Sequence, residues 1–448
     1  MTLVGMTRAV EAFFVRHRER LVWLHAAMAV VFIAVIGVPV FLPDPPGDAT
    51  PLTHWVTFAN YALWGLWFPL VFLSVIFTGR SWCGLLCPMG AAAEWANKRG
   101  PQRAIPGWLK WEGTPIVSFL IITILGQTVG VRDHPEAALE VFGGTMLAAI
   151  ALGFLYGRKK RAWCRHACPI GLLLGVFSRI GAVQFTPKMP RPGGDAWTEK
   201  GVCPTMIDLP RKEESRHCIQ CFRCVNSEAK GAVELRLRRP GTEIERIRHH
   251  HPNAAEVWFL FLGTGVALGG FLWLVLPQYQ DLRQTLGAWA IEREWFWIGD
   301  PGPWLLMSVH PERREVFVWL DFILIVSVMA AVMAVMAAVM AAATATAAWL
   351  AGPGFRSRFV ELGYQYAPVA MVSLVVGLGG MLFQPLGAFA GTAKGALFAI
   401  GILWSLWLGW RILAAQGVAP TRRVLASLPG LAGTLAVALA WWPAIFGL

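Results

Sequence analysis

The sequence predicts an all-α polytopic membrane protein of about nine transmembrane helices, with one small α+β insertion on the cytoplasmic side. First, 56% of the 448 residues are hydrophobic and only 15% are charged, a balance far from that of soluble domains. Second, a single long polar segment, residues 183–254, interrupts the apolar sequence. Third, nine apolar stretches approach or exceed the roughly 20 helical residues that cross a bilayer, and they lie at 21–42, 58–78, 115–131, 139–157, 256–277, 317–350, 367–391, 395–415 and 424–446.

The charges of the chain are distributed unevenly along it. A net charge of +12 would suggest nucleic-acid binding in a soluble protein, but here the basic residues gather in alternate loops. Residues 158–254 contain 19 Lys and Arg against 9 Asp and Glu, whereas the loop 43–57 contains no Lys or Arg. Because basic loops stay in the cytoplasm, we expect a multi-pass protein of the bacterial inner (cytoplasmic) membrane. Its N-terminus and all eight cysteines would lie on the cytoplasmic side, with lipid around it and no nucleic-acid partner.

A cysteine motif occurs twice in the first part of the chain. The pattern Trp-Cys-x3-Cys-Pro-x-Gly lies at 82–90 and again at 163–171, each time after the second helix of a predicted pair. This repeat indicates a duplicated two-helix hairpin, and packing of the two copies would bring four thiols to one site at the membrane interface. Within each copy the thiols are about one helical turn apart, and they belong to Cys83, Cys87, Cys164 and Cys168.

The polar segment contains the other four cysteines. They form Cys-Pro at 203–204 and Cys-x2-Cys-x2-Cys at 218–224. A bacterial ferredoxin contains the run Cys-x2-Cys-x2-Cys-x3-Cys-Pro twice, and the fourth cysteine of each run binds the cluster of the other run. The cysteines present here are the last of one run and the first three of the next, which share a cluster. The sequence therefore predicts one [4Fe-4S] cluster with the ligands Cys203, Cys218, Cys221 and Cys224.

The ligands of the neighbouring ferredoxin cluster are missing, so the segment keeps half of a two-cluster ferredoxin. Their positions are occupied by Gly193, Ala196, Glu199 and Glu228. Four thiolates also suit structural zinc, but zinc sites usually pair their ligands as two Cys-x2-Cys units, and the triple run is typical of a cluster. Alternating apolar and polar residues at 231–238 predict a short strand behind the cluster loop.

Three interpretations of the hairpin thiols stay open: a second cubane cluster, a thiol or metal relay such as one for copper, and structural helix caps. Repeated intracellular Cys-Pro pairs usually bind something. Trp82 and Trp163 either cover this site from water or, as the simpler interpretation, anchor the helix ends in the membrane interface.

Over about residues 55–240, the doubled hairpin motif and the cysteine loop resemble the NapH/MauN/NosR group of membrane ferredoxin-type proteins. The resemblance implies electron transfer from the quinol pool, or from a cytoplasmic ferredoxin-like donor, toward a periplasmic reductase system. A quinone and a redox partner protein are the implied partners, and the activity would be similar to that of a quinol dehydrogenase, although no catalytic residue is assigned. A related group with a similar motif order handles copper for cytochrome oxidase.

The sequence thus predicts three parts: residues 1–182, a four-helix membrane domain with the duplicated hairpin; residues 183–254, a cytoplasmic ferredoxin-like loop; and residues 255–448, a five-helix membrane domain of unknown role. The alternative function is a copper-handling or metalloenzyme assembly factor that uses the hairpin thiols and methionines. Soft thioether ligands for it lie on one face of the sixth span, although a packing seam is the default explanation of this row, which consists of Met329, Met333, Met336 and Met340.

Overall fold

The computed structural model describes residues 3–158, 160–188, 202–225 and 233–446. Over these residues the regular secondary structure is helical apart from two antiparallel two-stranded sheets, and turns and loops connect the elements. Eight helical stretches are long and apolar enough to cross a membrane, and a ninth apolar helix is shorter. The predicted all-α polytopic fold with about nine spans is therefore confirmed.

Several spans are built from consecutive helical elements. The first two stretches are Val4–Phe41 (α1, Leu3–His17; η1, Arg18–Arg20; α2, Leu21–Gly37; η2, Val38–Phe41) and Trp55–Thr78 (α3, Trp55–Asn60; η3, Tyr61–Trp67; α4, Phe68–Thr78). They are followed by the shorter helix Thr114–Thr128 (α7) and by Pro135–Leu155 (α8, Pro135–Ala138; η5, Leu139–Gly143; α9, Gly144–Leu155). The last five are Ala254–Val275 (α13), Trp319–Ala351 (α15), Phe355–Leu378 (α16, Phe355–Gly363; η11, Tyr364–Tyr366; α17, Ala367–Leu378), Gly380–Ala415 (η12, Gly380–Phe389; α18, Ala390–Ala415) and Pro420–Ala440 (α19). The elements between and after them are η4 (Trp82–Leu86), α5 (Pro88–Asn97), α6 (Gly107–Lys110), α10 (Ala162–His166), α11 (Gly171–Ser178), β1 (Val183–Pro187), η7 (Leu209–Arg211), β2 (Val233–Leu237), α12 (Thr242–Glu245), η8 (Ile247–His249), α14 (Pro277–Glu292), η9 (Phe296–Gly299), β3 (Val309–His310), η10 (Pro311–Arg313), β4 (Glu315–Val316) and α20 (Trp442–Phe446).

The seventh span begins earlier than its hydropathy predicts. The apolar window covers 367–391, whereas the helical stretch runs over Phe355–Leu378. Polar residues in its first turns lower the hydropathy of this stretch, and partners within the protein accept or donate their hydrogen bonds. Glu361, for example, is 1% exposed and accepts hydrogen bonds from Ser357 at 2.9 Å and from Gln416 at 2.8 Å.

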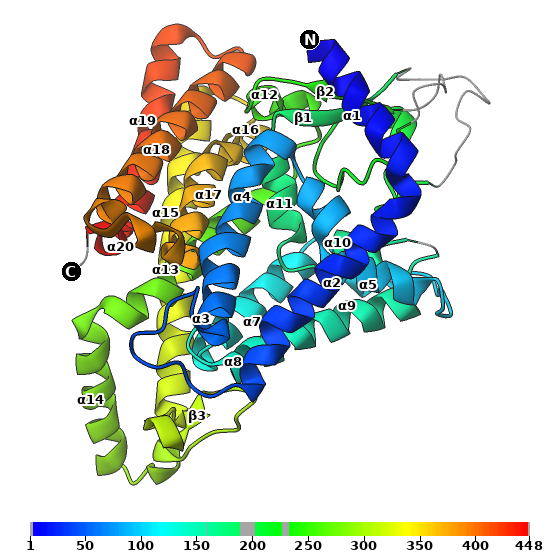
Figure 1. Ribbon diagram of the computed structural model, residues 1–448. Coiled ribbons are helices and arrows are strands. Elements are labelled where there is room, and N and C mark those ends of the chain that lie inside the picture. The colour runs from blue at the N-terminus through cyan, green and yellow to red at the C-terminus, as the bar shows by residue number, and fades with distance from the viewer. Residues whose placement is uncertain (1–2, 159, 189–201, 226–232, 447–448) are drawn as a thin grey trace.

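The two sheets lie at opposite ends of the helical body. Strand β1 pairs antiparallel with β2, with Val183 opposite Leu237 and Phe185 opposite Leu235, so the strand predicted at 231–238 is present from residue 233. Figure 1 shows this sheet and α12 at one end, with α14 and β3 at the other. The cysteine loop, which connects β1 to β2, therefore lies near the same end of the helical body as this sheet.

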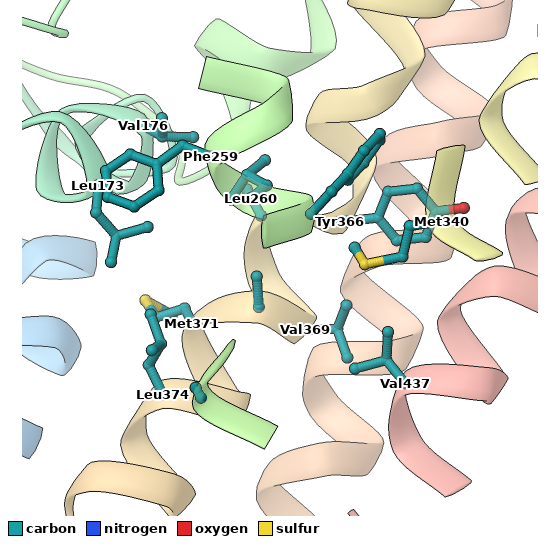
Figure 2. Packing of buried hydrophobic residues seen from close by; sticks show 14 of the residues in the cluster. Leu173, Val176, Phe259, Leu260, Met340, Tyr366, Val369, Met371, Leu374 and Val437 are labelled. Carbon is teal, nitrogen blue, oxygen red and sulfur yellow. The ribbon is translucent and has the colours of Figure 1, made fainter. Parts of the chain in front are cut away.

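One hydrophobic core joins helices of the two hairpin copies to the helices of residues 255–448. The largest cluster of buried side chains contains residues of α4 and α11 together with residues of α13, α15, α17, α18 and α19. Figure 2 shows Leu173 of α11 facing Phe259 of α13, with Met371 and Leu374 of α17 beside them. Helices 255–448 therefore pack directly on the hairpin helices.

The methionine row of α15 is part of this core. Met329 and Met340 are fully buried and Met336 is nearly so. Helix α13 approaches the row through glycines, because an added Cβ on Gly265 would stand 2.8 Å from the Met333 Cα, and one on Gly269 would stand 2.9 Å from the Met329 Cα. The explanation of the row as a packing seam is thus confirmed.

Candidate functional site

The two copies of the hairpin exchange the helices that follow their cysteine motifs. After its cysteine motif, each copy packs its next helix on the helix that precedes the other motif, so α5 lies on α9 and α11 lies on α4. Asn97 of α5 donates Nδ2 hydrogen bonds to the carbonyl oxygens of Gly153 at 2.7 Å and Tyr156 at 2.9 Å. On the other side, the rings of Phe72 and Phe177 meet edge to face. This exchange turns the two motifs toward each other.

All four hairpin thiols line one cavity as a result. The first cysteine of each motif is buried and the second is partly exposed. The cavity has a volume of about 160 Å³, and its wall includes Cys83, Cys87, Cys164 and Cys168. Trp82 and Trp163 belong to the same wall, so both tryptophans cover the thiol site, which the simpler interpretation as interface anchors did not foresee.

The Cys-Pro-x-Gly part of the motif shapes the thiol site locally. Cys87 has an extended backbone, and the proline after it begins α5, while the Cys87 Sγ accepts a hydrogen bond from the Gly90 nitrogen at 3.5 Å. An added Cβ on Gly90 would lie 3.2 Å from the Cys164 Sγ, and one on Gly171 would lie 3.6 Å from the Cys168 Sγ. Each motif glycine therefore keeps side-chain atoms out of the thiol site.

Burial raises the pKa of two thiols of this site, Cys87 and Cys168. Burial raises the pKa of Cys87 to about 12, with further increases from Cys164 and Cys83. Burial, followed by the neighbouring thiols Cys164, Cys87 and Cys83, also raises the pKa of Cys168 well above its ordinary value. Binding of a metal by these two groups as thiolates must therefore release protons.

Two buried arginines stand beside the hairpin thiols at equivalent positions, three residues before the first cysteine of each motif. Arg80 is 2% exposed and Arg161 is 1% exposed. Arg80 places Nη2 3.8 Å from the Cys83 Sγ, and Arg161 donates Nη1 to the Cys83 carbonyl at 3.1 Å. Among the described residues, the buried Arg80 Nε and Arg161 Nη2 atoms have no hydrogen-bond partner.

These unpartnered donors test whether the site suits a cluster. Buried N–H groups require acceptors, and a thiolate-bound iron–sulfur cluster is an acceptor whose potential depends on hydrogen bonds and net charge. Four converging thiols with two buried cations therefore fit an anionic cluster. The sequence analysis did not single out Arg80 and Arg161, although their shared place in the repeat was a signal that could have found them.

The four cysteines of the polar segment converge on a second and smaller cavity. Its volume is about 20 Å³, and its wall includes Cys203, Cys218, Cys221 and Cys224. Gln220 and Phe222 adopt left-handed backbone angles, with φ of 52° and 57°, and each lies between two cysteines of the cavity wall. Burial, then Cys218, Cys221 and Cys203, raises the pKa of Cys224 well above its ordinary value.

This loop is held by a small apolar core of its own. The ring of Phe222 stacks on Phe14 of α1 with centroids 3.8 Å apart and meets Phe185 of β1 edge to face. Cys203 is itself 8% exposed in this core. The positions of the missing ferredoxin ligands, Gly193, Ala196, Glu199 and Glu228, lie outside the described residues.

The two four-cysteine sites touch through their backbones. Gly84 lies between the two cysteines of the first hairpin motif, and an added Cβ there would stand 2.2 Å from the Ile219 carbonyl oxygen and 2.8 Å from the Cys221 nitrogen. Only a glycine permits so close an approach. The cysteine loop therefore rests directly on the hairpin site.

A carboxylate links the two sites beside this contact. Glu94 of α5 pairs with Arg161 of the second hairpin motif at 2.7 Å and with Arg223 of the cysteine loop at 2.6 Å. Burial alone would raise the pKa of Glu94, but Arg161 and Arg223 lower it to about 2. Glu94 is thus ionised at neutral pH and neutralises part of the positive charge.

The hairpin cavity continues away from the thiols between apolar helices. Its wall there is formed by α2, η3, α4, α7 and η5, with Leu378 closing it from α17. The polar residues of this part are Thr123, Gln127, Arg132 and Thr145. Arg132 donates Nη2 to the Gly377 carbonyl at 2.6 Å, and its buried Nε has no partner among the described residues.

A group of potential metal ligands lies near the opposite end of the helical body. His134, Glu136 and His310 offer ligand atoms within 4.8 Å of one another. However, Arg313 Nη1 donates to His134 Nδ1 at 2.6 Å, which leaves the ring proton on Nε2, 3.1 Å from Glu315. His134 therefore accepts a hydrogen bond from Arg313 and lies beside the Glu315 carboxylate, and we assign no metal to it.

Comparison with known families agrees with the repeat. The 4Fe-4S binding domain Fer4_5 matches residues 62–110 and again residues 141–187, one match for each hairpin copy. No solved structure gives a significant match to the chain.

Three curated relatives illustrate the range of similarity. An uncharacterised protein of Methanocaldococcus jannaschii is 26% identical over 37% of this chain and 68% of its own length. The methylamine utilization ferredoxin-type protein MauN of Paracoccus denitrificans is 27% identical over 28% of this chain and 47% of its own length. The ferredoxin-type protein NapH of Escherichia coli is 25% identical over 33% of this chain and 58% of its own length. The domain match and these relatives support a 4Fe-4S protein with a role in electron transfer.

Proposed function

We propose, from the premise that this chain belongs to the NapH/MauN-type ferredoxin-type membrane proteins, that it passes electrons between a quinol in the membrane and a redox partner protein. Two [4Fe-4S] clusters would serve this transfer, each bound by one of the four-cysteine sets. A cubane cluster supplies a one-electron redox couple. The ligands would be Cys203, Cys218, Cys221 and Cys224 for one cluster and Cys83, Cys87, Cys164 and Cys168 for the other.

The contact between the two cysteine sites is the observation that carries the proposal. Gly84 separates two hairpin ligands, and its backbone abuts Cys221, a ligand of the loop. A cluster in the loop alone would lie in a separate cavity from the one between the membrane helices. With the second site beside it, the four hairpin thiols provide the connection between the loop and the cavity inside the membrane body.

The apolar part of the hairpin cavity supports a quinol as the membrane substrate. Its wall combines aromatic and aliphatic side chains with few polar groups, which is typical of small-molecule sites. The buried Nε of Arg132 offers a hydrogen bond to a ring oxygen. Oxidation of a quinol releases two electrons and two protons, so the protein would accept the electrons one at a time. The helices of residues 255–448 contribute Leu378 to this wall, and the Gly377 carbonyl holds Arg132 in place.

Metal and sulfide analysis of anaerobically purified protein tests the cluster assignment. We expect about eight irons and eight acid-labile sulfides per chain, because each cubane holds four of each. About four of each would leave the hairpin site without a cluster, and stoichiometric zinc without sulfide would remove both clusters from the proposal.

Filling the cavity tests the quinol. Thr145→Phe places a ring among the lining residues, so we expect the EPR signals of the clusters to form normally with dithionite but to appear much more slowly with a reduced short-chain quinol. Leu147→Phe on the same helix is the matched control, because Leu147 is 68% exposed. Equal reduction by quinol in both variants would contradict the quinol site.

We also propose that the cysteine sites face the cytoplasm. The basic loops support this side, and the test uses two exposed positions at opposite ends of the body. Lys98→Cys, on a side chain 66% exposed, should escape a membrane-impermeant thiol reagent in intact cells. Glu312→Cys, on a side chain 65% exposed, should react. The reverse pattern would invert the topology.

A further inference from the structure

The charges around the hairpin thiols are balanced differently at the two arginines of the repeat. Arg161 donates Nε to the carboxylate of Glu94 at 2.7 Å, which neutralises part of its charge. Arg80 is equally buried, yet none of the ion pairs among the described residues includes it. Its Nη1 donates to the Arg216 carbonyl at 2.7 Å, and its Nη2 points to the Cys83 Sγ at 3.8 Å.

A buried guanidinium without an anion is unfavourable, and arginine cannot escape this by losing its proton. The carboxylates nearest to the site are already engaged, because Glu94 serves Arg161 and Arg223. The anion that remains for Arg80 is whatever the thiols hold. Arg80 also lines the thiol cavity together with all four hairpin cysteines, whereas Arg161 is not among the residues of its wall.

The local chain geometry fixes Arg80 in this position. Gly79 turns the chain after α4 with a φ of 60°, and an added Cβ there would stand 2.1 Å from the Gln220 Nε2 of the cysteine loop. The guanidinium is also close to α11, since an added Cβ on Gly175 would lie 3.5 Å from its Nη1. Arg80 is therefore wedged between α11, the cysteine loop and the thiols.

We propose that Arg80 is the counter-ion of the group bound by the hairpin thiols and that its charge sets the reduction potential of that group. The inference rests on the proposed function, because it requires a cluster at the hairpin site. Reduction adds one negative charge to a cluster, and an unneutralised cation beside it favours the reduced form. Arg80 thus acts as a positioning and charge-setting residue, and it keeps the hairpin cluster easier to reduce than its thiols alone would make it.

An EPR-monitored redox titration of Arg80→Gln tests the proposal. We expect the reduction equilibrium of the hairpin cluster to become at least tenfold less favourable, which is about 59 mV for a one-electron couple. The cluster of the loop should shift less. The hairpin signal is identified as the one that Cys83→Ser abolishes. Arg80→Lys keeps the charge, so its hairpin cluster should have a reduction potential close to that of the parent protein.

Arg161→Gln is the matched control at the equivalent position of the repeat. Because Arg161 already has a carboxylate partner in Glu94, we expect a smaller change in the hairpin potential than in Arg80→Gln. Equal shifts in the two variants, or no shift in Arg80→Gln, would overturn the assignment of Arg80.

A second measurement covers the case in which Arg80→Gln binds no cluster. In cluster-free protein the unpaired cation is unfavourable, so Arg80→Gln should melt at the same or a higher temperature than the parent. A large drop in the melting temperature of the cluster-free variant would show that Arg80 stabilises the fold without a cluster, and this result would overturn the proposal. Failure of the proposed function is distinguishable, because the parent protein itself would then contain about four irons.

Discussion

The hairpin site and the loop site use the same ligand type, but different structures hold their ligands. In the hairpin site, the cysteines come from two motifs that are distant in the sequence, at 82–90 and 163–171, and the exchange of α5 and α11 between the copies brings them together. In the loop site, three of the four ligands lie within the short segment 218–224, and left-handed turns at Gln220 and Phe222 place them. The hairpin site therefore depends on long-range helix packing, whereas the loop site depends mainly on local backbone conformation.

The largest expected difference between the two sites is in iron content after one cysteine of either site is replaced. Cys83→Ser should lower the iron content from about eight to about four per chain and leave the loop cluster in place, and Cys218→Ser should do the reverse. Iron and sulfide analysis with EPR measures this. If either variant loses all of its iron, the sites assemble as one unit and the comparison fails.

Glu94 joins the two sites, so its loss should affect both. Glu94→Gln leaves Arg161 and Arg223 without their shared carboxylate, and breaking a buried ion pair in this way costs about 3–5 kcal/mol. Thermal melts in detergent should show a large decrease in melting temperature. Lys98→Gln is the control, since this exposed lysine lies 4.0 Å from Glu94 and should cost less than about 1 kcal/mol.

Glu243 supports the frame of the loop site and makes it sensitive to acid. Its Oε1 accepts the Ser215 nitrogen at 3.1 Å, three residues before Cys218. Burial alone would raise the pKa of Glu243, but Arg238 and Arg179 lower it to about 2 from the ordinary 4.5. This contribution is therefore present above pH 4.5 and is lost as the pH falls through 2, and the difference in pKa corresponds to about 3 kcal/mol.

The measurement is the free energy of unfolding of cluster-free protein against pH. Glu243→Gln should be less stable than the parent at pH 6 and should lose less of its stability between pH 4.5 and 2. Parallel curves for the two proteins would show that Glu243 does not cause the acid sensitivity.

The smallest of these effects concerns the contact at Gly84. Gly84→Ala must push the loop away from the hairpin, because its Cβ would meet the Ile219 carbonyl oxygen at 2.2 Å. We expect a loss of about 1–3 kcal/mol, the usual cost of overpacking. Electron transfer between the two clusters should also become slower after rapid reduction. Gly144→Ala on α9, where nothing lies within 4 Å, should change neither quantity and is the matched control.

Sequence patterns predicted the parts of the molecule that depend on local information. The apolar windows located the spans, since the hydropathy of one continuous stretch decides whether it crosses the membrane. The repeat indicated that four hairpin thiols would meet, and the ferredoxin spacing grouped the other four. The predicted strand at 231–238 lies in β2, where Val233–Leu237 pairs with β1.

The relative placement of the two sites was not predictable, because it depends on contacts between distant segments. Nothing near Gly84 in the sequence indicates that Ile219 and Cys221 will lie on it. The seventh span was misplaced for a related reason: Glu361 looks unsuited to a membrane helix until its partners Ser357 and Gln416 are known. Arg80 and Arg161 required both the repeat and their burial to be recognised.

The exchange of helices between the hairpin copies also has a consequence for biosynthesis. Cys83 and Cys87 leave the ribosome well before their partners Cys164 and Cys168. At synthesis rates of about 5–20 residues per second, this delay lasts roughly 4–16 s. During that time helix α9, on which α5 packs, has not been made, and the site contains only two of its four thiols. Delivery of the proposed cluster to the hairpin site would therefore follow insertion of the second hairpin, as a late step in maturation.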